Sequence, residues 1–244
     1  MRIAILFLTA AISVHVLAEE PATGEPATKE DATREEKVTI VVTASKHGQK
    51  ISEAPAAVTV ITAEDIAASG VSNVAELFRR VPGLDFIQTG ARDINVNARG
   101  FNNLLSRRLL VLVDGRSVYL TILGFVLWDG IQVTLDDIER IEVVRGPGSA
   151  LYGANASSGV VNIITKAPRD IDGTCVMVGA GELGTREARV LSGYAWGDVG
   201  FKVAASYYET EPFPNPDRDP DSQFQREGEP ATKQPKGYAR FEHG

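Results

Sequence analysis

The chain of 244 residues is 43% hydrophobic and 23% charged, a composition that suits one or two folded domains and gives no sign of wholesale disorder. A formal net charge of -7 argues against a nucleic-acid-binding protein, because such proteins present basic surfaces to phosphates. The single cysteine, Cys175, excludes an intrachain disulfide. The three histidines lie far apart in the sequence, so they predict no metal-ligand cluster.

Residues 1–18 have the pattern of a secretion signal peptide. Arg2 precedes an almost wholly apolar run, and small residues lead to a cleavage position at Ala18. The alternative is a membrane-spanning helix, but the run falls short of the roughly 20 residues that such a helix needs. Residues 19–37 are charged and lack aromatic and β-branched aliphatic side chains, so we expect a disordered tether there.

Residues 38–44, with the sequence VTIVVTA, form an abrupt apolar segment whose β-branched side chains favour a strand. A short strand beside a flexible tether has no local pairing partner. The segment is therefore either the first strand of the following domain or a strand that adds to the sheet edge of another protein.

Residues 45–168 mix short helix and strand patterns, which predicts a small α+β domain. Thr62 is placed to cap a helix that begins at Ala63 and ends at Gly70. A second helix is expected over residues 73–80, with Ser72 as its cap. The Asp114-Gly115 pair predicts a two-residue hairpin turn. Strands are expected at residues 57–61, 94–99, 109–113, 116–119, 141–144 and 160–165.

The pattern changes to long strand-like segments after Pro168. They span residues 174–181, 185–195 and 199–208, and a fourth is expected from Gly237, after a long polar loop over residues 209–236. In the third segment one face is apolar and the other is mixed, as in a membrane barrel, although a soluble sandwich would alternate similarly. Residues 173–244 have room for about three or four strands, whereas the smallest single-chain barrels have about eight. We therefore expect a fragment or a truncated product.

The glycine-rich run IERIEVVRGPGSALYG at residues 138–153, followed by GVVNIITK at residues 159–166, strongly resembles the plug signature of TonB-dependent receptors. The rival interpretation is a phosphate-binding loop, but no Gly-Lys-Ser/Thr follows and Pro147 lacks an amide donor. Further segments that resemble the family occur in its order at residues 39–44, 58–62, 77–84, 98–101 and 112–115.

This resemblance implies a plug domain inside a 22-stranded barrel in the outer membrane of a Gram-negative bacterium. It implies active import powered by a TonB protein, which would pair with a coupling box of six residues: Thr39, Ile40, Val41, Val42, Thr43 and Ala44. It also implies that Arg99, Gly100, Arg145 and Gly146 contact the barrel, with the arginines paired to barrel glutamates. Ordinary solvated arginines are the alternative.

The resemblance implies that apical plug loops contact an extracellular small-molecule ligand, and the candidates are Gln88, Arg92, Tyr119 and Trp128. For Tyr119 and Trp128, packing against the barrel wall is an equal alternative. An iron complex such as a ferric siderophore is the default ligand, with haem and cobalamin as further possibilities. We expect membrane lipid as a second partner, and no cofactor, catalytic residue or nucleic-acid partner.

The alternatives to import are a soluble binding module, an enzyme, a calcium site and a signalling receptor. A plug-like domain without a barrel could act as a soluble periplasmic binding module. An enzyme with a Ser-His-Asp triad lacks the histidines to build one. Asp217, Asp219 and Asp221 mimic half of a calcium loop, but the expected glycine and terminal glutamate are absent. Residues 19–37 also leave no room for an N-terminal signalling domain.

Overall fold

The computed structural model describes residues 40–45, 48–50, 56–88, 94–98, 108–120, 124–211 and 232–243, which belong to one compact unit. The expected signal peptide and tether, the aspartates of the half calcium loop, and Thr39, Arg92, Arg99 and Gly100 lie outside these residues. Within the described ranges, no helix is both long and apolar enough to cross a membrane.

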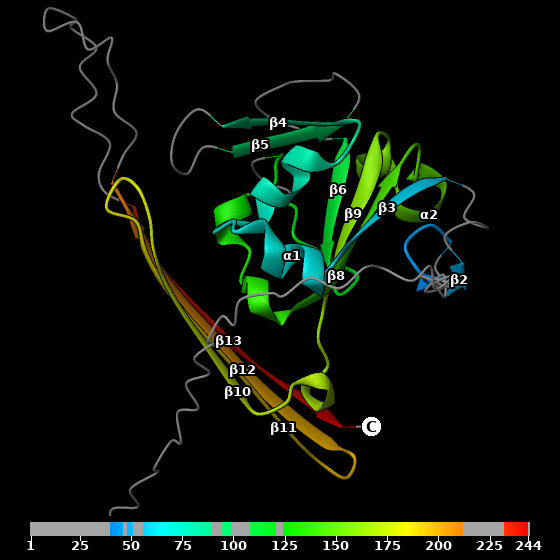
Figure 1. Ribbon diagram of the computed structural model, residues 1–244. Coiled ribbons are helices and arrows are strands. Elements are labelled where there is room, and N and C mark those ends of the chain that lie inside the picture. The colour runs from blue at the N-terminus through cyan, green and yellow to red at the C-terminus, as the bar shows by residue number, and fades with distance from the viewer. Residues whose placement is uncertain are drawn as a thin grey trace, which may run out of the picture. The chain divides into compact units, whose positions relative to one another are not determined.

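A five-stranded mixed sheet forms the centre of the first part of the chain (Figure 1). Its strands, in spatial order, are β3 (Ala57–Thr62), β8 (Ile138–Arg145), β9 (Gly159–Thr165), β6 (Leu109–Val113) and β7 (Arg116–Ser117). Only the β6–β9 pair is parallel. As predicted, Asp114 and Gly115 turn between β6 and β7, with φ angles of 48° and 76°. Such positive values are those of the primed turns that fit tight hairpins.

Helices and a small hairpin cover one face of this sheet. Helix α1 (Ala63–Ser69) begins with a capping box between Thr62 and Asp65 and ends at Gly70, as predicted. The second helix, η2 (Val74–Arg80), is a 3-10 helix whose cap is Asn73 and not Ser72, because the Asn73 side chain accepts from the Ala75 amide. The hairpin consists of β4 (Leu84–Gln88) and β5 (Ile94–Ala98).

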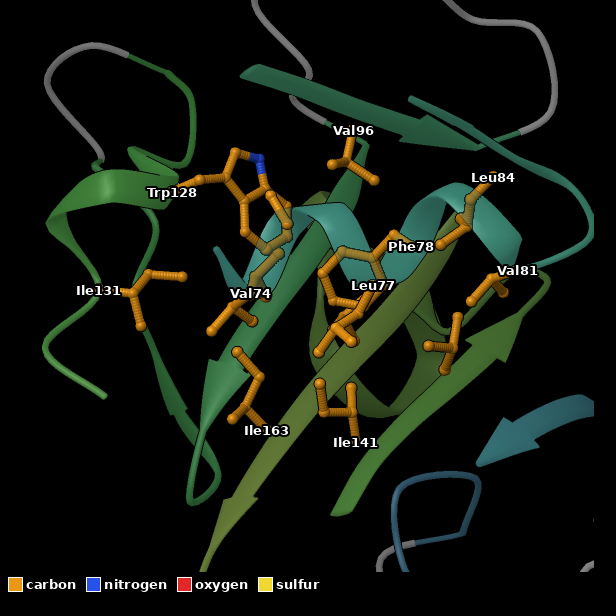
Figure 2. Close-up of a cluster of buried hydrophobic side chains, with 14 of the residues drawn as sticks. Val74, Leu77, Phe78, Val81, Leu84, Val96, Trp128, Ile131, Ile141 and Ile163 are labelled. Atoms are coloured by element: carbon orange, nitrogen blue, oxygen red, sulfur yellow. The ribbon is translucent and has the colours of Figure 1, made fainter. Parts of the chain in front are cut away.

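The main hydrophobic core lies between these elements and the sheet (Figure 2). Phe78 from η2 is fully buried, and its ring centre lies 5.2 Å from that of Trp128. Ile141 on β8 and Ile163 on β9 close the core from the sheet side. The alternation expected for residues 94–99 is incomplete within β5, because Asn97 is buried at 1% exposure.

Short helical turns connect the remaining strands of this first part. They are η3 (Trp128–Gly130), η4 (Leu135–Asp137), α2 (Ser149–Tyr152), η5 (Ala154–Ala156) and η6 (Pro168–Asp170). The last of them, η6, leads into the long strands. Gly193 on one of those strands lies against η6 so closely that an added Cβ would meet the Pro168 carbonyl oxygen at 2.8 Å.

Four long antiparallel strands follow in sequence order: β10 (Thr174–Ala180), β11 (Arg186–Trp196), β12 (Val199–Thr210) and β13 (Thr232–His243). The fourth strand begins at Thr232, five residues before the expected Gly237. One face is apolar and exposed. On it, Phe201 lies opposite both Tyr194 and Phe241, and all three rings are exposed to solvent.

Candidate functional site

The second face of the mixed sheet carries the predicted coupling box. Strand β1 (Ile40–Val41) pairs antiparallel with β2 (Gln49–Lys50), and the chain turns between them, with the Ser45 amide donating to the Val42 carbonyl at 3.4 Å. Val41 is fully buried. Ala44 joins a second apolar cluster with five residues of the sheet and its connections: Leu110, Leu112, Val144, Ala156 and Val160. The box is therefore docked on the plug.

Glu142, in the middle of β8, holds the docked box through its carboxylate. Its Oε2 accepts hydrogen bonds from the Val42 amide at 3.0 Å and the Thr43 amide at 2.8 Å. Its Oε1 accepts from Arg140 Nε at 3.0 Å. The Glu142 side chain is completely buried, and a buried charge is tolerated only where partners of this kind surround it.

Thr43 is the most completely bound residue of the box. Besides its amide, its carbonyl oxygen accepts from the Tyr152 hydroxyl at 2.9 Å, and its Oγ1 accepts from Asn162 Nδ2 at 3.2 Å. Asn162 on β9 lies directly opposite Glu142 on β8. Side chains of the neighbouring strands β8 and β9 therefore both form hydrogen bonds with Thr43, which is only 1% exposed.

The electrostatics of this contact favour a charged Glu142. Burial alone would raise the pKa of Glu142, but hydrogen bonds from the Thr43 side chain, the Thr43 and Val42 amides and Arg140 outweigh it, so the pKa lies below its usual value. Burial, and then the negative charge of Glu142, raise the pKa of Tyr152. Tyr152 therefore stays a protonated donor towards Thr43 at neutral pH.

The contacts of Glu142 and Asn162 with the box were not predicted from the sequence. Both stand where strand patterns would place an apolar side chain, in the runs IERIEVVR and GVVNIIT. A carboxylate and an amide opposite each other on a covered sheet face need hydrogen-bond partners. Polar residues at these strand positions therefore indicate that hydrogen-bond partners exist. They do not identify Val42 as a partner of Glu142, because the two residues lie 100 positions apart.

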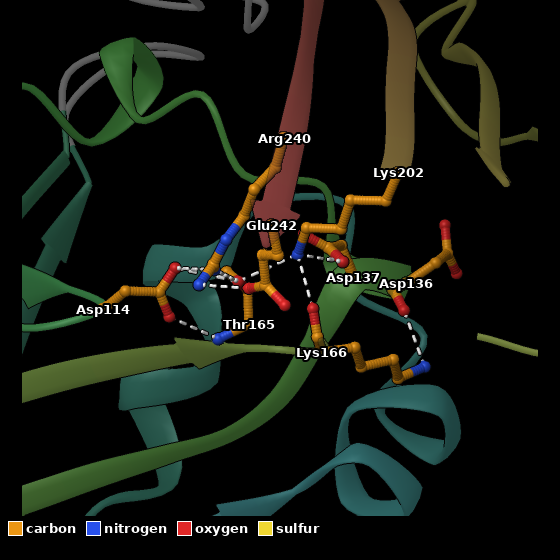
Figure 3. A network of polar contacts seen from close by, with 8 residues as sticks. All are labelled: Asp114, Asp136, Asp137, Thr165, Lys166, Lys202, Arg240 and Glu242. Carbon is orange, nitrogen blue, oxygen red and sulfur yellow. Dashed lines mark hydrogen bonds and ion pairs between the residues drawn. The ribbon is translucent and has the colours of Figure 1, made fainter. Parts of the chain in front are cut away.

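A second polar contact joins the first part of the chain to the long strands (Figure 3). Three basic side chains on β11, β12 and β13 reach three aspartates at the ends of plug elements. Lys202 contacts Asp137 at 2.9 Å, Arg240 contacts Asp114 at 2.9 Å, and Arg189 contacts Asp136 at 2.7 Å. The mixed face of β12 is thus the face that meets the plug.

Lys202 and Asp137 form the most deeply buried pair of this group. Both side chains are at 0% exposure. The ammonium donates to both Asp137 oxygens, to Thr165 Oγ1 at 2.9 Å and to the Lys166 carbonyl at 2.6 Å. Thr165 also donates to Asp114, so the lysine and arginine contacts form one network.

Of the predicted barrel contacts, Arg145 and Gly146 are described. Arg145 donates from one terminal nitrogen to the Pro82 carbonyl at 2.9 Å, while its Nε is buried and has no hydrogen-bond partner among the described residues. Gly146 has a φ of 138°, a conformation that side chains rarely adopt. A barrel glutamate as the partner of Arg145 stays a prediction.

The predicted ligand contacts do not form one group. Gln88 and Trp128 both line a cavity of about 510 Å³, together with Arg79, which donates to Gln88 Oε1 at 3.3 Å. Tyr119 is half-buried and is not among the residues that line it. Trp128 is 5% exposed and packs in the core, so the structure gives it a packing role within the plug, and its contact with a ligand stays a prediction.

Comparison with known proteins supports the family suggested by the motifs. Residues 50–160 match the family model of the TonB-dependent Receptor Plug Domain. The chain is 37% identical over 178 residues to the Vitamin B12 transporter BtuB of Vibrio vulnificus, a match that covers 72% of this chain and 28% of the relative. The Vibrio cholerae protein of the same name is 40% identical over 164 residues, 66% of this chain and 26% of the relative. The chain thus spans about a quarter of these relatives.

Solved structures give the same fold. The Pseudomonas aeruginosa receptor FpvA, bound to a heterologous pyoverdine with iron, matches 70% of this chain and 22% of its own with a TM-score of 0.59 and 22% identity. The Ferric-Catecholate import receptor Fiu of E. coli K12 matches 67% of this chain and 22% of its own, with a TM-score of 0.53 and 21% identity. The chain belongs to the TonB-dependent receptors: it carries their plug domain and, after it, antiparallel strands of the kind that build their barrels.

Proposed function

We propose that this chain supplies the plug and the energy-coupling segment of a transporter that imports a scarce ligand across the outer membrane of a Gram-negative bacterium. The observation that carries the proposal is the way in which the coupling box is bound to the plug. It rests on the sheet through side-chain hydrogen bonds and is not a strand of that sheet, so it can detach while the sheet stays intact. A detachable apolar strand is what a partner that pairs by strand addition requires.

The ligand is a bulky metal complex, for which two candidates have support. The sequence resemblance makes an iron complex the default. The curated relatives at 37% and 40% identity are vitamin B12 transporters, which makes cobalamin the first ligand to test. Uptake of labelled cobalamin and of labelled ferric siderophores by cells that carry the complete receptor separates the two.

Val41→Pro in the complete receptor tests the coupling role. Proline removes an amide donor and fixes φ, so strand addition at residues 39–44 should fail and uptake should be lost, while ligand binding at the cell surface should remain. Val42→Ala is the matched control, because it keeps the amide and shortens a side chain that is 37% exposed. Normal uptake by the proline variant would overturn the proposal.

A further inference from the structure

We infer that the ion pair between Arg189 and Asp136 is a gate: it separates two cavities that follow one another along the interface between the plug and the long strands. The inference rests on the proposed function, because a receptor that imports a ligand must stay sealed between import events. It assigns to Arg189 the sealing of one side of the plug.

The first cavity is the one of about 510 Å³ that Gln88 and Trp128 line. It extends to the end of the strands where β10 turns into β11 and where β12 stops, and Gly181 and Thr210 line it there. Its wall includes the buried Thr134, whose Oγ1 has no hydrogen-bond partner among the described residues. A buried hydroxyl of this kind favours water in the cavity.

A second cavity, also of about 510 Å³, lies towards the other end of the same strands. Its wall runs from helix α1 to Asp172 and Cys175, where β10 begins, and to Leu191 on β11. The short turn between β11 and β12 lies at this end, whereas the long loop before β13 lies at the opposite end. In the barrel topology that we predict, short turns face the periplasm. The second cavity then lies on the periplasmic side of the interface and the first on the outer side.

The two cavities meet at four residues that line both of them: Gly70, Leu135, Glu187 and Arg189. Arg189 crosses the interface at this point. Its Nε donates to Asp136 Oδ2 of the plug at 2.7 Å, and one terminal nitrogen donates to Glu187 Oε2 of its own strand at 3.4 Å. The Arg189 side chain is only 13% exposed, so its guanidinium group fills the space between the cavities.

The charges at this point make the contact one that can open. Arg189 lies between two carboxylates, one from the plug and one from β11. Without the guanidinium group, Asp136 and Glu187 would be like charges on opposite sides of the interface, and they would repel each other. Lys166 does not replace the arginine, because its ammonium donates to the main-chain oxygen of Asp136. Breaking this ion pair therefore joins the two cavities into one passage for water and small ions, which larger movements of the plug would widen for the ligand.

Arg189→Ala in the complete receptor tests the inference through leakage of small ions. In planar lipid bilayers, without ligand or TonB, its conductance should exceed that of the wild type at least about tenfold, which corresponds to about 1.4 kcal/mol of lost interaction. Arg240→Ala is the matched control, because Arg240 also binds a plug aspartate, Asp114, at 2.9 Å but lines neither cavity. Arg189→Lys keeps a positive charge between the two carboxylates and should leak less than Arg189→Ala.

The outcomes decide between a gate and a general loosening of the plug. A leak in Arg189→Ala that is absent from Arg240→Ala and smaller in Arg189→Lys supports the gate. A sealed Arg189→Ala receptor overturns it, as does an equal leak in Arg240→Ala or in Arg189→Lys. If Arg189→Ala does not fold, Asp136→Asn keeps the size of the side chain and should leak by a smaller factor; no leak there also overturns the inference.

The conductance requires neither ligand nor TonB, so a failure of the gate leaves the proposed function standing. Uptake of ligand that does not require TonB would instead contradict the proposed function and would not change the conductance result.

Discussion

Replacing Lys202 by methionine tests how the plug is fixed to the long strands. Lys202 and Asp137 are both at 0% side-chain exposure, and the ammonium has four acceptors around it. Lys202→Met leaves the Asp137 carboxylate buried without its cation. Removing one partner of a buried pair costs about 3–5 kcal/mol, which corresponds to a factor of about 100 to a few thousand in the unfolding equilibrium of the plug.

The matched control is Lys233→Met on the neighbouring strand β13. Lys233 pairs with Glu209 at 3.1 Å, but its side chain is 61% exposed, and exposed pairs contribute about 0–1 kcal/mol. The assay is urea-dependent thiol labelling of a Val161→Cys receptor in which Cys175 has been replaced, because Val161 is buried until the plug unfolds. Adding Asp137→Asn to Lys202→Met should recover much of the loss. Equal effects of Lys202→Met and Lys233→Met would refute the reasoning.

Three further predictions concern pH, packing and topology. Because the pKa of Glu142 is lowered from 4.5, its hydrogen bonds stabilise the docked box above about pH 4.5 and are lost as the pH falls through the lower docked value. Tyr152, whose pKa is raised, keeps its proton over this range. A spin label at Val42→Cys, with Cys175 replaced, should therefore become mobile only in acid, and mobility at neutral pH would contradict the docked geometry. Trp128→Ala should lower plug stability by about 3–5 kcal/mol, as for other buried aromatic residues. Tyr119→Ala should weaken ligand binding alone. The reverse pattern in thermal unfolding and ligand-binding assays would count against both assignments. With Cys175 replaced, a cysteine at Ser222 should react with an impermeant thiol reagent on intact cells, and one at Asp198 only after the outer membrane is opened; the reverse order would show that the strand count is wrong.

Local patterns predicted most elements of the fold. The capping box at Thr62 and the Asp114-Gly115 turn depend on neighbouring residues, so they could be read from the sequence. Ser72 and Asn73 are both good capping residues, and only the packing of η2 selects the second. The 3-10 geometry of η2 was not visible in its apolar spacing either.

The contacts of the site could be predicted only in part. The box was identified from its β-branched run and its resemblance to the family. Its docking depends on Glu142 and Asn162, which lie about 100 and 119 positions further along the chain. In the same way, alternation on β12 indicated a mixed face that includes Lys202, but not its aspartate partner, 65 positions earlier. Pairing of charges across such distances follows from the topology and not from any local pattern.

We expect transport through the complete receptor to depend on the TonB partner. Uptake of labelled cobalamin and ferric siderophores should be compared in cells that carry the complete receptor, with and without TonB. One ligand should bind to both kinds of cell but accumulate only in those with TonB. Equal accumulation in both would contradict it.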